Sequence, residues 1–395
     1  MGSLIPLWIF FCPKVLAHSK KHAGSSILSL SKKVVFSCPK TNLHMKQIII
    51  ATICLLAFCQ YSSAQADTVE AIILNSDSLE AGKLYNSGIT KFKAKNFDGA
   101  LADFSKAIEL RKDFHSAYLN RGSVYMEQKD YSKAISDYNI SLNDPENKKT
   151  AYFLRARCYM ELGSHDKAEG DLGSAIEADP TSDKPHYYMG AIQFGKGDYQ
   201  EAINSYSKAI ELNKTYAHAY NDRASAKRQL EDYAGAISDY KRALIIDNSL
   251  VFAHNNLGSA LRRSGDLKGA IKSYSTAISL VGKNHMAYNN RGSAKYDDGD
   301  FKGAMQDFTK AISLKKDYAF AYNNRAAAKF KLQDYKGCID DCTKAIDLNS
   351  NYGFAYLNRG NARELLRDDS GACADWNKAI ELGVKSAQQH IGDCK

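Results

Sequence analysis

The chain has 395 residues, and 53 Lys and Arg against 44 Asp and Glu give it a formal net charge of +9. Residues 1–66 contain seven Lys and no Arg, Asp or Glu, so only +2 remains for the rest of the chain. Phosphate binding needs clustered positive charge, which a nearly neutral segment does not offer. The charge distribution therefore argues against RNA or DNA as a partner.

Residues 1–66 contain the pattern of a secretory signal. A lysine directly after Met45 is followed by the apolar run 48–59 and then by a small-residue A-x-A sequence that ends at Ala66. This is the order that a signal needs, and the apolar run is too short to span a bilayer permanently. We expect translation to start at Met45, cleavage near Ala66, and export to the periplasm or cell envelope, with residues 67–80 as a linker.

Two alternatives for this leader stay open. The sequence that ends at Cys59 resembles a bacterial lipoprotein box, although Phe58 occupies a position where a small residue is expected. A lipid on Cys59 would anchor the protein to a membrane. The leader is also acid-poor and Ser-rich, as organelle transit peptides are, but it lacks the arginines that are typical of them.

From Ala81 to Ser386 the chain repeats a 34-residue pattern nine times without insertion or deletion. The eighth position is always Gly or Ala, the twentieth is Ala in every repeat except for Cys338, and the twenty-seventh is Ala or Ser. Small residues at these intervals let two helices approach closely, and large aromatic residues at other fixed positions fill the space around them. Each repeat is therefore predicted to be a helical hairpin.

The sixteenth position predicts where the second helix of each hairpin begins. It holds side chains that can cap a helix N-terminus, namely Asn96, Asp130, Ser164, Asp198, Asp232, Asp266, Asp300, Asp334 and Asp368. Glycine often precedes it, as expected for a residue that ends a helix in left-handed geometry. Because no repeat shows the alternation of a strand, we expect an all-α fold.

Residues 287–314, AYNNRGSAKYDDGDFKGAMQDFTKAISL, resemble the tetratricopeptide repeat in period, small positions and aromatic positions. The resemblance implies tandem helix-turn-helix repeats in a right-handed superhelical solenoid, with the first helices lining a concave surface. It covers residues 81–386 as one elongated domain. The polar residues 387–395 are expected to begin a capping segment.

Two positions of the repeat change together. The seventh is Arg in six repeats, and the twenty-third of the same six repeats is Asp. Where Met189 or Leu257 replaces the arginine, Ser205 or Ser273 replaces the aspartate. Such linked change predicts a contact between the two helices of one hairpin, with a structural role.

The five cysteines after the leader are an odd number, so we expect no disulfide framework. Cys338 and Cys342, four residues apart, could form half of a soft-metal or redox site, but two buried small side chains are the simpler interpretation. No nucleotide-binding, zinc-protease or hydrolase motif is present. We expect no enzyme activity, no cofactor, no metal site and no catalytic residue.

Asparagines recur on the predicted first helices, where a carboxamide can both donate to and accept from the backbone of an extended peptide. The fifth and sixth repeat positions supply the candidate peptide-binding residues Asn120, Asn221, Asn255, Asn256, Asn289, Asn290, Asn323, Asn324 and Asn358. This arrangement is similar to the asparagine ladder of O-linked N-acetylglucosamine transferases, whose catalytic region is absent here. The alternative is a set of polar residues on a solvated helix face, without a ligand.

These features together predict a non-catalytic adaptor of the cell envelope that holds a protein or extended peptide in its concave groove. The alternative is a structural solenoid that assembles with itself. The sequence identifies neither the partner nor the oligomeric state.

Overall fold

The computed structural model describes residues 77–394, and all regular structure in that part of the chain is helical. The described residues belong to a compact unit that starts at Asp77. The predicted signal, with Met45, Ala66 and Cys59, lies outside the described residues. Residues 77–93 are mostly helical and form the first helix, so the last four residues of the predicted linker belong to the first hairpin.

Two helices occupy each repeat, as predicted. After residues 77–93 the helices are α2 (Phe97–Leu110), α3 (His115–Glu127), α4 (Tyr131–Ser141), α5 (Lys148–Glu161), α6 (His165–Ala178), α7 (Asp183–Lys196), α8 (Tyr199–Leu212), α9 (Ala217–Gln229), α10 (Tyr233–Ile246), α11 (Val251–Arg263), α12 (Leu267–Leu280), α13 (His285–Asp297), α14 (Phe301–Leu314), α15 (Ala319–Lys331), α16 (Tyr335–Leu348), α17 (Gly353–Leu365), α18 (Asp369–Glu381) and the 3-10 helix η1 (Lys385–Asp393). The all-α prediction is confirmed for the described residues.

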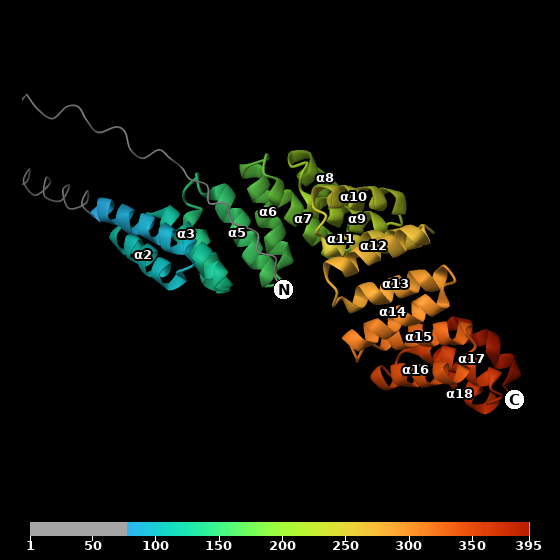
Figure 1. The fold of residues 1–395 in the computed structure, drawn as a ribbon. Helices are drawn as coiled ribbons and strands as arrows, with labels where there is room; N and C mark the ends of the chain where they lie inside the picture. The colour runs from blue at the N-terminus through green and yellow to red at the C-terminus, as the bar shows by residue number, and fades with distance from the viewer. Residues whose placement is uncertain (1–76, 395) are drawn as a thin grey trace, which may run out of the picture. The chain divides into compact units, whose positions relative to one another are not determined.

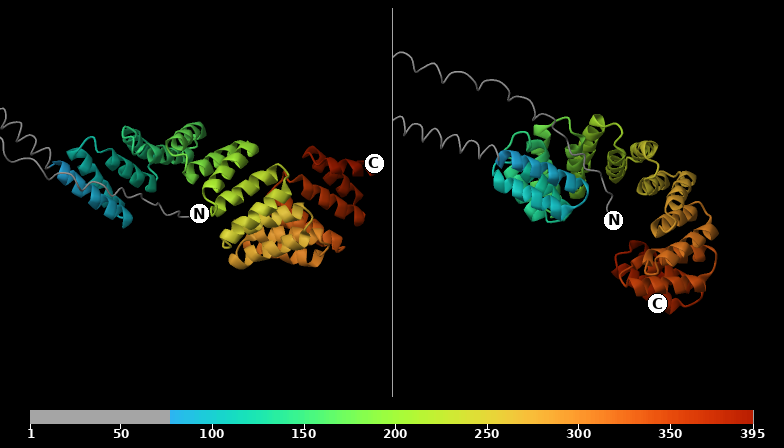
Figure 2. Two further views of the ribbon diagram at one scale, coloured as in Figure 1. Left: turned by 90° about the horizontal axis from the view of Figure 1, so that it is seen from above. Right: turned by 60° about the vertical axis from the view of Figure 1, so that its left-hand side comes forward.

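The hairpins stack in chain order, each against the next (Figures 1 and 2). Within a hairpin, α13 packs along α14 and α15 along α16, and α14 then packs against α15 of the following hairpin. Successive first helices also contact each other directly, as α11 does with α13 and α13 with α15. The first helices therefore form a continuous row of surfaces, which is the architecture of a tandem-repeat solenoid.

The small and large positions fit together as the sequence predicts. A Cβ added to Gly292 in α13 would lie 2.7 Å from Cε1 of Phe308 in α14, so the ring would have to shift to admit an alanine at this position. In the third and eighth repeats alanine takes the glycine's place, and the smaller Leu172 or Cys342 takes the ring's place. The fifth repeat instead combines Ala224 with the full ring of Tyr240. Phe308 is almost completely buried, and a fully buried side chain of this size contributes about 2 kcal/mol of transfer free energy.

The second helices begin at the predicted caps. Seven of the nine side chains at the sixteenth position accept a hydrogen bond from the third residue of their helix, as Asp300 does from the Gly303 N–H at 2.9 Å. Ser164 and Asp198 make no such side-chain bond, although α6 and α8 begin directly after them as predicted. The residue before each cap has a positive φ, for example 83° at Gly299.

The predicted contact between the seventh and twenty-third positions is present in all six hairpins. In the seventh repeat, Arg291 donates from Nε to Asp307 Oδ2 at 2.8 Å and from Nη2 to Asp307 Oδ1 at 2.7 Å. Its Nη1 donates to Ser275 Oγ of the preceding hairpin at 3.0 Å. Because Asp307 is buried, its hydrogen bond raises the pKa of the Arg291 guanidinium. One arginine thus joins the helices of its own hairpin and also binds the hairpin before it.

The first repeat, which lacks the arginine, satisfies its aspartate in another way. Lys91, four positions after Ser87, lies with Nζ 2.6 Å from Asp103 Oδ2. Burial is the largest single influence on the pKa of Asp103 and raises it. Hydrogen bonds from Lys91 and Ser87, together with the charge of Lys91, outweigh burial, so the pKa is lowered. In the first repeat, therefore, Lys91 pairs with the aspartate in place of the seventh-position arginine.

One expectation about the cysteines was wrong. Cys373 in α18 forms a disulfide with Cys394, 21 residues later. The sequence count did not reveal it because η1 folds back onto α18, where His390 also stacks on Trp376 with ring centroids 4.8 Å apart. The C-terminal segment covers the end of the last hairpin as predicted, but as a 3-10 helix that begins at Lys385.

Candidate peptide-binding face

The sixth position of the first helices lies on the exposed side of the helix row except at the buried Leu154, and we call these surfaces together the first-helix face. Asn256, Asn290, Asn324 and Asn358 all keep part of their side chain accessible. The fifth position points the other way, since Asn221, Asn289 and Asn323 are buried. The predicted double row of amides therefore has one accessible member per repeat.

The two positions are joined between repeats by a regular hydrogen bond. Each sixth-position amide donates from Nδ2 to the fifth-position Oδ1 of the preceding repeat, as Asn324 does to Asn289 at 3.0 Å and Asn358 to Asn323 at 2.9 Å. Asn256 makes the same bond to Asn221 at 3.3 Å. An amide used in this way retains one N–H and its own carbonyl oxygen for another partner.

The same contact occurs with other chemistry near the N-terminus. Asn120 donates to the Tyr85 hydroxyl at 2.8 Å, again from the sixth position to the fifth position of the preceding repeat. Where both positions are apolar they pack instead, as in Phe153 and Tyr188, whose ring centroids lie 5.5 Å apart. At each of these junctions, therefore, the sixth position and the fifth position of the preceding repeat are either both polar or both apolar. The two positions are 35 residues apart in the sequence.

One junction in the described chain breaks the hydrogen-bond pattern. Asn255 donates from Nδ2 to the Val251 carbonyl at 3.3 Å, and its buried Oδ1 has no partner. Asn290 in the next repeat makes no side-chain hydrogen bond to any described residue, and its amide is partly exposed. Among the sixth-position amides of repeats six to nine, Asn290 thus has its complete hydrogen-bonding capacity available.

A carboxylate ends the amide row toward the N-terminus. Asp222 accepts from the Tyr187 hydroxyl at 2.7 Å and from Asn221 Nδ2 at 2.8 Å. Burial raises the pKa of Asp222, and these two hydrogen bonds oppose the effect. The carboxylate lies where the following four repeats have asparagine.

These contacts narrow the predicted site. Asn221, Asn289 and Asn323 are held inside by inter-repeat bonds, so they position the sixth-position amides and are not themselves accessible to a ligand. Asn255 is half-buried and bonds to its own backbone. The residues that a ligand could reach are therefore the sixth-position amides. They form an unbroken row in the sixth to ninth repeats, and the predicted Asn120 is separated from this row by three repeats without a sixth-position amide.

The first helices of repeats six to nine also carry a row of exposed apolar side chains. The second position of repeats six to nine carries Phe252, Met286, Phe320 and Phe354, with exposed fractions of 43, 55, 53 and 56%. Met286 continues the row between Phe252 and Phe320. The signal of this row was the recurrence of large apolar residues at one position in four successive repeats.

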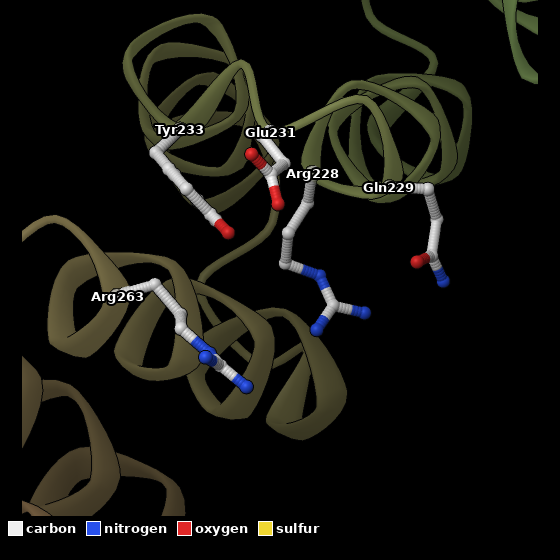
Figure 3. A pocket seen from close by; sticks show the side chains of 5 residues that line it. All are labelled: Arg228, Gln229, Glu231, Tyr233 and Arg263. Carbon is white, nitrogen blue, oxygen red and sulfur yellow. The ribbon is translucent and has the colours of Figure 1, made fainter.

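The described chain also contains an open hollow of about 210 Å³ beside the turn between α9 and α10 (Figure 3). Arg228, Arg263, Glu231, Tyr233 and Gln229 line it, and both arginine side chains extend into the same gap. Arg228 and Arg263 lie in the last turns of their helices, where the helix dipole favours positive charge. Helix stabilisation accounts for these charges without a ligand.

The cysteine pair is structural, as the simpler interpretation predicts. Cys338 and Cys342 are both buried in the core between α15, α16 and α17. A hydrogen bond with Cys338, together with burial, raises the pKa of the Cys342 thiol well above its ordinary value, which disfavours the thiolate needed for metal binding or redox chemistry. No group of three or more His, Cys, Asp or Glu able to hold a metal ion occurs among residues 77–394.

Comparison with known families agrees with the repeat pattern. Three family models, each described as tetratricopeptide repeat, match residues 85–148, 150–182, 184–216, 217–249, 255–335 and 319–352. The chain belongs to the tetratricopeptide repeat family. The comparison with curated proteins gave no match.

One solved structure shows the same fold at low sequence identity, and others match shorter parts of the chain. A tetratricopeptide repeat protein from Parabacteroides merdae is 20% identical, with a TM-score of 0.52, over 62% of this chain and 98% of that chain. The protein MamA is 27% identical over 42% of this chain and 96% of that chain, with a TM-score of 0.38. YrrB, described as a tetratricopeptide repeat protein with an unusual peptide-binding site, is 21% identical over 47% of this chain and 95% of that chain, with a TM-score of 0.41.

Among residues 77–394, none of the helices has the length and apolar character that a membrane-spanning helix needs.

Proposed function

We propose that this tetratricopeptide repeat protein is a non-catalytic adaptor that holds an extended segment of a partner protein on its first-helix face. The observation that carries the proposal is the row of sixth-position amides, each of which keeps a free carbonyl oxygen and at least one free N–H. Such a row can pair with a peptide backbone whatever its side chains are. The inter-repeat bonds hold Asn256, Asn324 and Asn358 in place before binding, which reduces the entropy lost on association.

The most direct test replaces Asn290 by Ala. Its side chain makes no intramolecular hydrogen bond to the described residues, so the change should not weaken the solenoid. Asn204→Ala is the matched control, because Asn204 is an exposed asparagine on the second helix α8. Pull-down from the native cell fraction, with circular dichroism to confirm folding, should show partner loss for Asn290→Ala only.

The triple variant Asn256→Ala, Asn290→Ala and Asn324→Ala should abolish capture altogether. It also removes two inter-repeat bonds, so its thermal midpoint has to be measured beside the binding. Unchanged capture by a folded triple variant would refute the proposal. Light scattering that shows concentration-dependent oligomers would favour the self-assembling solenoid.

We also propose that the protein acts in the cell envelope. The leader pattern supports export, and the Cys373–Cys394 disulfide suits an oxidising compartment. N-terminal sequencing of the protein from that compartment should begin at Asp67. A mature chain that retains Lys14 would refute export through a signal at Met45, and a lipid-modified Cys59 would establish the anchored alternative.

A further inference from the structure

The exposed apolar residues of the first-helix face occur in repeats six to nine, where the sixth position is asparagine in every repeat. We call Phe252, Met286, Phe320 and Phe354 the apolar row. The same position holds polar residues in the four preceding repeats, Ser116, Thr150, Lys184 and His218. A single exposed apolar side chain needs no explanation, but four in register on successive helices form a surface that water does not favour.

The apolar row and the amides share one face of each helix. The second and sixth positions are four residues apart, so their side chains lie one helical turn from each other. In α15 these are Phe320 and Asn324, and in α17 they are Phe354 and Asn358. A main chain lying along the amides would therefore bring its side chains beside the apolar row.

The apolar row is partly fixed by neighbouring rings. Phe320 lies with its ring centroid 5.1 Å from that of Tyr352 and 6.0 Å from that of Tyr318. The Tyr352 hydroxyl in turn accepts from Asn323 Nδ2 at 3.2 Å, and Asn323 accepts from Asn358. The aromatic and amide positions are thus connected in one network, which orders both before a ligand arrives.

Charge on this face limits the kind of partner. Between the apolar row and the amides there is no charged side chain in repeats six to nine, and the ninth position adds only Ser259, Ser293, Ala327 and Asn361. The seventh-position arginines of these helices are each paired with a buried aspartate of the same hairpin, and Arg262 pairs with Asp297. A strongly acidic or basic segment would gain no opposite charge here and would lose hydration.

We infer that the first-helix face of repeats six to nine binds an uncharged extended segment that carries spaced aromatic or branched apolar side chains. Its backbone pairs with Asn256, Asn290, Asn324 and Asn358, and its side chains bury against the apolar row. This inference rests on the proposed function and specifies the partner's chemistry. Aromatic anchors in such contacts dominate binding free energy, so the apolar row determines affinity and the amides determine register.

The test uses an array of synthetic 12-residue peptides in three classes, neutral with aromatic and branched residues, acidic, and basic. The purified full chain should bind the neutral class, and the variant Phe320→Ser with Phe354→Ser should bind it at least tenfold more weakly. Ile245→Ser is the matched control, because Ile245 is exposed on the second helix α10. That control should bind as the wild type does.

Three outcomes would overturn the inference. Preferred binding of acidic or basic peptides that depends on Asn290 but not on Phe320 would leave the proposed function intact and refute the apolar partner. Absence of binding by all three classes would contradict both. Concentration-dependent self-association that disappears in the double Phe variant would show that a second copy of the chain occupies the apolar row.

Discussion

The buried ion pair of the seventh repeat allows a quantitative test of how the hairpins are held together. Replacing Asp307 by Ser removes the acceptor of two bonds from Arg291 and one from Lys295, whose Nζ lies 2.8 Å from Asp307 Oδ2. The side chains of Arg291 and Asp307 are only 19% and 6% exposed. Breaking a buried pair on one side costs about 3 kcal/mol, because the remaining charge is left without its partner.

The assay is hydrogen exchange of the backbone amides in α13 and α14, because a long repeat array need not unfold in one step. A loss of about 3 kcal/mol corresponds to exchange that is roughly a hundredfold faster. Adding Arg291→Leu should restore most of the protection, since Leu257 and Ser273 form this combination naturally in the sixth repeat. The two substitutions are therefore expected to be strongly non-additive.

The matched control is Asp297→Ser, which breaks the pair with Arg262 between two hairpins. Both side chains of that pair are more than a third exposed, so the loss should stay below about 1 kcal/mol. Equal effects of Asp307→Ser and Asp297→Ser would refute the reasoning. An additive double variant would also refute it, because the linked change of the two positions would then have no energetic basis.

Three further outcomes follow from the packing, the disulfide and the buried carboxylate. Gly292→Ala should lower the thermal midpoint by forcing the Phe308 ring aside, at a cost of about 2 kcal/mol, and adding Phe308→Leu should recover part of it. Reducing the bond between Cys373 and Cys394, or replacing Cys373 by Ser, should speed hydrogen exchange in α18 and leave α13 unchanged. Because burial raises the pKa of Asp222, the folded state keeps its proton to higher pH than the unfolded state does, so ionisation destabilises the fold as the pH rises. Asp222→Asn should therefore raise the thermal midpoint at pH 7 but hardly at pH 4, and an equal gain at both values would contradict this assignment.

The hairpins were predictable because nine repeats of one length act as an internal alignment. The contact of Gly292 with Phe308 follows from small and large residues that recur at fixed positions of the repeat. The pairing of Arg291 with Asp307 follows from two positions that change together. The hydrogen bond from Asn324 to Asn289 was not predicted, because it joins two different repeats at a spacing of 35 residues. Comparing the sixth position with the fifth position of the preceding repeat would have revealed it.

Other features depend on geometry that a repeat pattern does not contain. The disulfide between Cys373 and Cys394 requires η1 to turn back onto α18, and no other repeat has an equivalent segment. The sequence also does not show which amides are accessible. Adjacent residues such as Asn289 and Asn290 point in different directions from the helix axis, and the sequence does not show which direction faces the neighbouring helices. Only the packed hairpins show that Asn289 is buried and that Asn290 remains partly exposed.

The central claim is that the first-helix face of repeats six to nine holds an extended partner segment, and crosslinking at Met286 tests it most directly. A photoreactive side chain at position 286 in living cells should give an adduct with a different protein, and Asn290→Ala should remove that adduct. The same group at position 245 on α10 is the control and should give none. An adduct of the protein with itself, or equal adducts at 286 and 245, would contradict the account.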